Sequence, residues 1–328
     1  MMRGLLLTNL GTPSGSNVAA VRSYLREFLT DKRVIDIPAV IRYCLVYGII
    51  LPFRSSKSAH AYQTIWTDKG SPLLTESQQL VSELQKIIGS QYKLALGMRY
   101  GEPSIRQAMD ELKDCHSITI LPLFPQYSSA ATGSSIEEVL KVAMNREVFP
   151  SLQVIRDFYQ NPAYIQAQAQ LIKDHLPQNS FLLFSYHGIP ERQIKKSGCV
   201  NVCEGICPPI NNMNQGCYKA QCHHTTSLLA RELHLESNQY STAFQSRLGK
   251  TPWIRPYTDE VLKELAAKGI KNLTITCPSF VTDCLETLEE IGMRAREQWL
   301  ELGGEQFTLI PGMNHHPMWI KALAEIIN

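Results

Sequence analysis

The chain contains one short string twice, and this repeat limits what it can fold into. Residues 5–13 read LLLTNLGTP and residues 182–190 read LLFSYHGIP, so both fit the pattern LL-x-[TS]-x-x-G-x-P. Each copy is an apolar run that ends in glycine and proline, as expected for a buried strand followed by a turn. A second pair, residues 121–124 and 277–280, reads LPLF and CPSF. The repeats predict two halves with similar folds.

Short apolar runs alternate with longer segments that suit helices, which is typical of βα units and a parallel sheet. The runs expected to form strands fall four to each half, at residues 5–9, 92–97, 118–123, 152–155, 181–186, 239–244, 273–277 and 307–310. The length of 328 residues is enough for two domains. We therefore expect an α/β fold in two similar domains, residues 1–160 and 161–328, each with a four-stranded parallel sheet flanked by helices.

The composition excludes several classes of protein. The net charge is only +2, so no broad basic surface is available for nucleic acid. The longest uncharged apolar stretch, residues 44–53, is far shorter than the roughly 20 residues that span a bilayer. The first residues lack the apolar length of a secretory signal. We expect a globular cytoplasmic protein with no transmembrane span and no nucleic acid partner.

One histidine follows an expected strand directly. Ligands of open α/β sheets bind beyond the carboxyl ends of the strands. His187 follows the run 181–186 and precedes Gly188, where backbone can approach a ligand closely. The sequence lacks the G-x-G-x-x-G fingerprint of dinucleotide enzymes and the G-x-x-x-x-G-K-[ST] phosphate loop. His187 is a candidate for proton transfer or metal binding; a histidine that only hydrogen-bonds neighbouring carbonyls is the alternative.

An acidic helix start follows the run 273–277 and includes Asp283, Glu286 and Glu290. Asp283 as N-cap with Glu286 three residues later would form a capping box, and acidic residues in a first turn suit the helix dipole. Alternatively, Glu286 and Glu290 share a helix face and line up two carboxylates beside His187. Histidine with carboxylates binds divalent cations or moves protons. Both interpretations remain open at this point.

Six strings together resemble the ferrochelatases. They occur in the family's order and read GLLLTNLGTP, GMRYGEPSI, LPLFPQYSSAATGSS, LFSYHGIPER, TAFQSRLGKTPWIRPYTDE and TCPSFVTDCLETLEEI. The resemblance extends from Gly4 to about Pro311. It implies two Rossmann-like domains with a porphyrin cleft between them. It also implies a lyase that inserts Fe²⁺ into protoporphyrin IX to form haem, the last step of haem biosynthesis.

The resemblance implies that His187 and Glu286 are the catalytic residues and that both handle the Fe²⁺ substrate. Two pyrrole N–H protons must leave the macrocycle, and a hydrated metal must lose water as the ring takes over its ligands. Neutral imidazole and a carboxylate suit these two tasks, and the sequence does not assign one task to either residue. No organic cofactor is implied.

The resemblance also implies contacts with the porphyrin. The corresponding residues are Leu10, Arg99, Tyr100, Arg54, Lys57 and Ser71. Leu10, the repeat partner of His187, offers an apolar contact, and the last three lie where the family contacts the propionates; ordinary surface charge is the alternative for these. Residues 44–53 resemble the lip of the cleft, which holds a hydrophobic substrate and contacts a membrane surface. Packing within the first domain is the alternative for this stretch.

The sequence departs from the family pattern at three positions. Leu10 stands where relatives that use coproporphyrin tend to carry tyrosine, which favours protoporphyrin; a coproporphyrin ferrochelatase or another tetrapyrrole chelatase is the alternative. Cys284 stands where many eukaryotic members have histidine. Arg294 interrupts an acidic row that some members continue along the helix, which puts in doubt a metal path that needs a third carboxylate.

Five of the nine cysteines lie between His187 and a helix expected from Thr225. This cysteine window consists of Cys199, Cys203, Cys207, Cys217 and Cys222. It lacks the C-x-x-C pairs of common zinc sites. Four thiolates hold a [2Fe–2S] cluster, and some ferrochelatases carry one in this region. We predict a cluster on four of the five, with zinc or reduced thiols as alternatives. His223 and His224 are expected at the surface or in a cap.

Two functions of other classes fit part of the sequence. A tetrapyrrole or haem carrier would keep the cleft but would not need both His187 and Glu286. An iron–sulfur sensor would need the cysteine window but no working cleft. Turnover of iron and porphyrin by the purified protein separates both from an enzyme.

Overall fold

The computed structural model describes residues 2–199, 201–249 and 251–327. These residues form two compact units. The first unit comprises the chain up to Phe124, Ser128–Asp157 and Ile327, and the second comprises Pro125–Tyr127 and Phe158–Ile326. We propose that the units correspond to the domains expected at residues 1–160 and 161–328.

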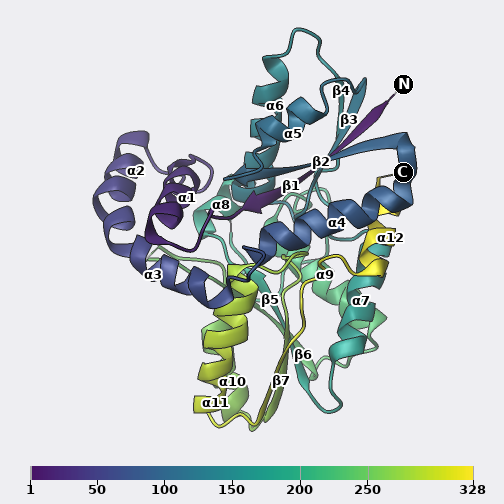
Figure 1. The fold of residues 1–328 in the computed structure, drawn as a ribbon. Coiled ribbons are helices and arrows are strands. Elements are labelled where there is room, and N and C mark those ends of the chain that lie inside the picture. Colours follow the sequence, from purple (N-terminus) through teal and green to yellow (C-terminus); the bar gives the residue numbers. More distant parts are fainter. Residues whose placement is uncertain (1, 200, 250, 328) are drawn as a thin grey trace. The chain divides into compact units, whose positions relative to one another are not determined.

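The first unit is built on a parallel sheet with the strand order β2-β1-β3-β4. Its strands are β1 (Arg3–Gly11), β2 (Tyr92–Tyr100), β3 (Ser117–Pro122) and β4 (Ser151–Val154). Its helices are α1 (Val18–Thr30), α2 (Ala39–Leu45), η1 (Val46–Ile50), α3 (Leu51–Ile65), α4 (Pro72–Ile88), η2 (Gly89–Gln91), α5 (Ile105–Glu111), η3 (Ser129–Gly133) and α6 (Ser134–Met144). Helices α5 and α6 lie on one side of the sheet and α4 on the other (Figure 1).

The core of the first unit explains why its central strands read as continuous apolar runs. Leu5, Leu6 and Leu7 of β1 are all fully buried, because helices cover both faces of the sheet. Edge strand β4 is mostly exposed. Local caps set the helix starts: Asn17 accepts from Ala20 at the start of α1, and Ser104 forms a capping box at the start of α5.

The second unit repeats this arrangement, with the strand order β6-β5-β7-β8. Its strands are β5 (Phe181–His187), β6 (Tyr240–Gln245), β7 (Asn272–Thr276) and β8 (Gln306–Leu309). Its helices are α7 (Pro162–His175), α8 (Glu191–Lys196), α9 (Tyr218–Glu232), α10 (Thr258–Ala267), η4 (Glu286–Ala295), α11 (Arg296–Glu301) and α12 (Pro317–Ile326). Helices α10 and α11 lie on one side of this sheet and α7, α9 and α12 on the other (Figure 1).

The predicted fold class is confirmed: both sheets have four parallel strands, flanking helices and the same strand order. Each expected run overlaps one observed strand. One helix boundary was predicted wrongly. Helix α9 begins at Tyr218, before Thr225, because the buried Tyr218, Lys219 and Ala220 form its first turn, where the helix can pair their carbonyl oxygens.

The apolar stretch 44–53 is helical and has two different faces. It runs from the end of α2 through η1 into α3. Val46 and Leu51 pack in a small core with Leu29. Phe53 is 78% exposed, and the nearby Tyr47 and Ile49 are more than half exposed. The stretch therefore both packs within its own unit and presents an apolar surface. No helix within the described part of the chain is long and apolar enough to cross a bilayer.

Candidate active site

His187 is the last residue of β5 and is half-buried. It pairs with Gln245 of β6, and the hydroxyl of Tyr218 donates a 2.8 Å hydrogen bond to its carbonyl oxygen. The next residue, Gly188, has no room for a side chain, because a Cβ there would lie 2.8 Å from the carbonyl oxygen of Gln245. The fold thus fixes the backbone of His187 at a strand end.

The imidazole of His187 is held through one nitrogen. Nδ1 lies 2.5 Å from the carbonyl oxygen of Gly188. A carbonyl only accepts, so Nδ1 carries the hydrogen in the neutral ring and Nε2 carries the lone pair. Nε2 has no hydrogen-bond partner among the described residues. The rings of Phe280 and Trp253 lie 6.0 and 6.4 Å from the imidazole, between centroids. The basic nitrogen is available to a substrate.

The predicted capping box at Asp283 and Glu286 does not form. The backbone N–H of Asp283 donates to Oδ1 of Asn314 at 2.8 Å. The Asp283 carboxylate accepts hydrogen bonds from Thr287, Gly312 and Asn314. The capping interpretation is therefore wrong, because Asn314 has taken the N–H that Glu286 would have capped.

Glu290 of η4 faces the end of β6. Ser246 follows β6 and donates twice to this carboxylate, from its backbone N–H to Oε1 at 2.8 Å and from its hydroxyl to Oε2 at 2.6 Å. The φ of Ser246 is +66°, in the left-handed region that few non-glycine residues adopt. This conformation aims both donors at one carboxylate and so fixes its position.

Burial raises the pKa of Glu290 above the usual range of a glutamate. The hydrogen bonds from Ser246 and the nearby His187 act in the opposite direction, whereas the neighbouring Glu286 raises the pKa further. These influences also indicate that His187, Glu286 and Glu290 lie close together. A carboxyl group with a raised pKa exchanges its proton nearer to neutral pH than an exposed one.

Sequence reasoning did not select Gln245 and Ser246, although both lie at the end of the expected strand 239–244. The side-chain amide of Gln245 donates to the carbonyl oxygen of Glu286 at 3.0 Å and so ties β6 to η4. The signal that selected His187, a polar residue at the carboxyl end of a strand, would have found both.

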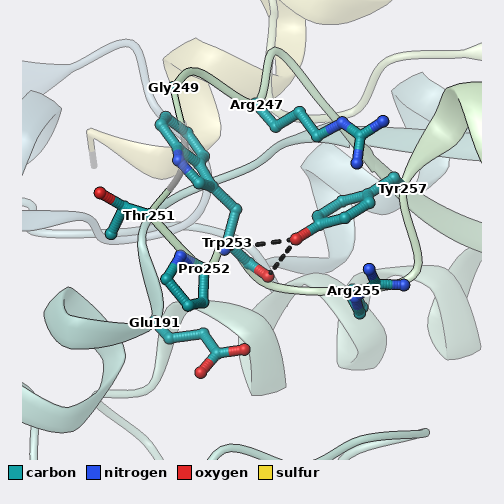
Figure 2. A pocket seen from close by; sticks show the side chains of 8 residues that line it. All are labelled: Glu191, Arg247, Gly249, Thr251, Pro252, Trp253, Arg255 and Tyr257. Atoms are coloured by element: carbon teal, nitrogen blue, oxygen red, sulfur yellow. Dashed lines mark hydrogen bonds between the residues drawn. The ribbon is translucent and has the colours of Figure 1, made fainter.

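A pocket of about 560 Å³ lies in the second unit beside Trp253 (Figure 2). It is lined by Glu191, Arg247, Gly249, Thr251, Pro252, Trp253, Arg255 and Tyr257. The ring of Tyr257 lies between two guanidinium groups, with Cζ of Arg247 at 4.3 Å and Cζ of Arg255 at 4.4 Å from its centroid. No predicted site residue lines this pocket. Trp253, whose ring lies near the imidazole of His187, is one of the lining residues.

The predicted porphyrin contacts Leu10, Arg99 and Tyr100 lie in the first unit, at the carboxyl ends of neighbouring strands. Leu10 is half-buried near the end of β1. Arg99 and Tyr100 end β2, and the Tyr100 side chain is fully buried. Arg99 forms a 2.7 Å ion pair with Asp31, a residue that sequence reasoning did not select.

The three other predicted contacts lie outside the strands of the first unit. Ser71 is buried just before α4, and its hydroxyl accepts a 2.8 Å hydrogen bond from Thr12. Arg54 and Lys57 are exposed on α3, and neither pairs with a carboxylate of the described residues. Their charges are therefore uncompensated by side chains within the described part of the chain.

The cysteine window is partly assembled. Burial raises the pKa of the Cys199 and Cys207 thiols, and the neighbouring thiols of Cys203 and Cys217 raise it further, so these four side chains lie close together. Cys222 is fully buried in α9. Over the described ranges 2–199, 201–249 and 251–327, no three His, Cys, Asp or Glu side chains are arranged to hold a metal ion. The side chains as placed therefore do not fit the predicted [2Fe–2S] cluster.

His223 of α9 is buried, so its expected position at the surface was wrong. The helix begins earlier than predicted and turns this side chain inward, where its Nε2 has no hydrogen-bond partner among the described residues. Burial, together with the charge of Lys219, lowers its pKa to about 4.

The depressed pKa of His223 predicts a loss of stability in mild acid. The unfolded chain takes up this proton near pH 6.5, whereas the folded protein does so only at about 4, so stability falls as the pH drops between these values. The full effect is roughly 3 kcal/mol. We expect His223→Gln to weaken the pH dependence of the free energy of unfolding, measured by urea denaturation. His60→Gln, on the exposed face of α3, should retain it. Identical pH dependence in His223→Gln and the unmodified protein would contradict the assignment.

Comparison with known proteins gives consistent matches over the whole chain. The family model described as Ferrochelatase matches residues 2–328. A ferrochelatase of Legionella pneumophila (strain Philadelphia 1) is 66% identical over 328 residues, covering 100% of this chain and 99% of that protein. A ferrochelatase of Coxiella burnetii (strain RSA 493) is 49% identical over 330 residues, covering 98% and 92%. The structure of SirB from Bacillus subtilis with Fe³⁺ matches with a TM-score of 0.56 at 14% identity, covering 100% of this chain and 94% of SirB. That likeness concerns the fold alone.

Proposed function

The chain belongs to the ferrochelatase family, and from this premise we propose that it inserts Fe²⁺ into protoporphyrin IX to form haem, the last step of haem biosynthesis. Ferrochelatases are lyases whose substrates are a porphyrin and Fe²⁺. The observation that carries the proposal is the imidazole of His187, whose Nε2 has no hydrogen-bond partner among the described residues, near the half-buried carboxylate of Glu290.

Metal insertion requires the macrocycle to lose two pyrrole N–H protons while iron exchanges water for ring nitrogens. The lone pair on Nε2 of His187 accepts a pyrrole proton. The raised pKa of Glu290 suits a group that receives a proton from the imidazolium and passes it on. Glu286 supplies negative charge for the incoming Fe²⁺. Iron keeps its oxidation state, so the reaction needs no organic cofactor.

The proposal assigns porphyrin contacts to Leu10, Arg99, Tyr100, Arg54, Lys57 and Ser71. Arg54 and Lys57 are three residues apart on α3 and lack carboxylate partners among the described residues, which supports their pairing with two propionates. The exposed apolar side chains of residues 44–53 support contact with a membrane surface. The protein acts in the cytoplasm in this proposal.

The choice between the two porphyrins is tested with both as substrates. We expect kcat/KM for protoporphyrin IX to exceed that for coproporphyrin at least about 10-fold, since an apolar Leu10 suits the less polar macrocycle. Leu10→Tyr should narrow this ratio, and Leu10→Met, which keeps an apolar side chain of similar size, should preserve it. A preference for coproporphyrin would make the protein a coproporphyrin ferrochelatase. Binding of porphyrin without turnover would indicate a carrier.

The [2Fe–2S] cluster on four of Cys199, Cys203, Cys207, Cys217 and Cys222 stays a prediction. The closeness of four of these thiols favours it, and the lack of a suitable ligand group in the described residues weighs against it. Visible absorption and iron content after purification without oxygen show whether the cluster is present or absent. No step of the reaction above depends on a cluster.

A further inference from the structure

Asp31 is a nearly buried carboxylate that collects hydrogen bonds from three separate segments. It follows α1 directly, and its side chain is 7% exposed. Its donors are the backbone N–H of Arg33 at 2.7 Å, Nη2 of Arg99 at 2.7 Å, the hydroxyl of Tyr100 at 2.9 Å and the hydroxyl of Ser134 at 2.5 Å. Three of these donors share the single oxygen Oδ2.

The carboxylate of Asp31 is charged in this setting. Burial alone would raise its pKa, but the hydrogen bonds from Ser134, Arg33 and Tyr100 and the charge of Arg99 outweigh burial and lower the pKa below its ordinary value. Asp31 therefore acts as a fixed anion around which the end of β2 and the start of α6 are arranged.

Arg99 is held at two of its three nitrogens. Nη2 donates to Asp31, and Nε donates to the hydroxyl of Ser134 at 2.6 Å. The guanidinium also lies over the ring of Tyr100, with Cζ 4.5 Å from the centroid. Nη1 has no hydrogen-bond partner among the described residues, and the side chain is only 13% exposed. One edge of a fixed, poorly hydrated cation is thus left for a ligand.

We propose that Asp31 is a positioning residue for metal insertion, which fixes Arg99 so that its free Nη1 edge faces the porphyrin as the pyrrole protons leave. This inference rests on the proposed function, in which Arg99 contacts the porphyrin. Loss of the two protons leaves negative charge on the ring nitrogens, and a cation held in place stabilises that charge more in the transition state than in the bound substrate. The effect therefore falls on kcat rather than on KM.

Positioning and simple charge balance predict opposite results for Asp31→Asn. The amide keeps the size of the side chain and can still accept from the N–H of Arg33, but its NH₂ group cannot accept from Arg99. If Asp31 only offset the charge of Arg99, its loss would strengthen the positive field and raise the rate. If it positions Arg99, the rate falls. We expect kcat to fall roughly 30-fold, with KM for porphyrin changed less than about two-fold.

A double-mutant comparison shows whether the effect passes through Arg99. In Arg99→Ala protein, Asp31→Asn should reduce kcat no further. Ser134→Ala removes the hydroxyl that bridges Arg99 and Asp31 and should also lower kcat. This variant replaces Asp31→Asn in the test if the Asp31→Asn protein does not fold. Glu27→Gln is the matched control. It removes one carboxylate charge from α1, the helix that Asp31 follows, and the Glu27 carboxylate accepts a hydrogen bond from the N–H of Gly101 rather than from Arg99.

Three results overturn the inference: an unchanged kcat in folded Asp31→Asn and Ser134→Ala proteins, an equal loss from Glu27→Gln, or fully additive effects of Asp31→Asn and Arg99→Ala. A lower melting temperature with normal kcat would make Asp31 purely structural. Normal turnover in Arg99→Ala would instead remove Arg99 from the proposed function, so the two failures are distinguishable.

Discussion

Replacing His187 with alanine is expected to lower the rate of iron insertion about 1000-fold while the protein remains folded. The substitution removes Nε2, the basic nitrogen at the end of β5. The fold should survive because the ring is half-buried and, among the described residues, hydrogen-bonds to the carbonyl of Gly188 alone. The measurement is the initial rate of Fe²⁺ insertion without oxygen, followed by porphyrin absorbance, together with the melting temperature.

His175→Ala is the matched control for this experiment. Nδ1 of His175 also lies near a backbone carbonyl, that of Leu171 at 2.9 Å, but the residue is exposed at the end of α7. Its replacement should leave turnover unchanged. A folded His187→Ala protein that inserts iron at a near-normal rate would remove His187 from the mechanism, and the alternative of a histidine that only satisfies its own backbone would then hold.

Glu286→Gln is expected to lower turnover at least about 100-fold with little change in melting temperature. Glutamine keeps the shape of the side chain but removes the negative charge that the proposal assigns to the Fe²⁺ substrate. Stability should hold because the N–H of Asp283 is already paired with Asn314 and does not depend on Glu286. Steady-state kinetics with varied Fe²⁺ and a thermal melt provide the two readouts.

Glu289→Gln makes the same chemical change within the same π-helical segment. Glu289 pairs with Nε of Arg294, at 2.8 and 3.0 Å from its two oxygens, so its carboxylate is already engaged. It should retain activity. A Glu286→Gln protein that loses stability but keeps its turnover would point to a purely structural role for Glu286.

The strands were predictable because a parallel strand that is buried on both faces has a continuous run of apolar residues. Leu5 to Leu7 and residues 182–184 are continuous apolar runs, since helices cover both faces of each sheet. Helix starts were harder to predict. The start of α9 depends on the burial of Tyr218 and Lys219, which no local pattern announces. The π geometry of η4 is likewise absent from any local signal.

The residues of the candidate site likewise differ in whether a local feature of the sequence reveals them. His187 could be selected as a candidate because it lies at a strand end, which is a local feature of the sequence. Asp31 was not found, because its partners Arg99 and Ser134 are 68 and 103 residues away. Only the folded chain brings them together. The hydrogen bonds from Ser246 to Glu290 likewise depend on a backbone conformation with positive φ, which a serine in the sequence does not predict.

The hydrogen bond between His187 and the carbonyl of Gly188 has a consequence for how the protein tolerates sequence change. In many enzymes the tautomer of a working histidine is chosen by a carboxylate from a distant segment, so one remote substitution can reverse it. Here the tautomer is set by a hydrogen bond between two adjacent residues. Substitutions elsewhere in the chain therefore leave the tautomer of His187 unchanged. The dipeptide itself tolerates almost no substitution, since Gly188 has no room for a side chain.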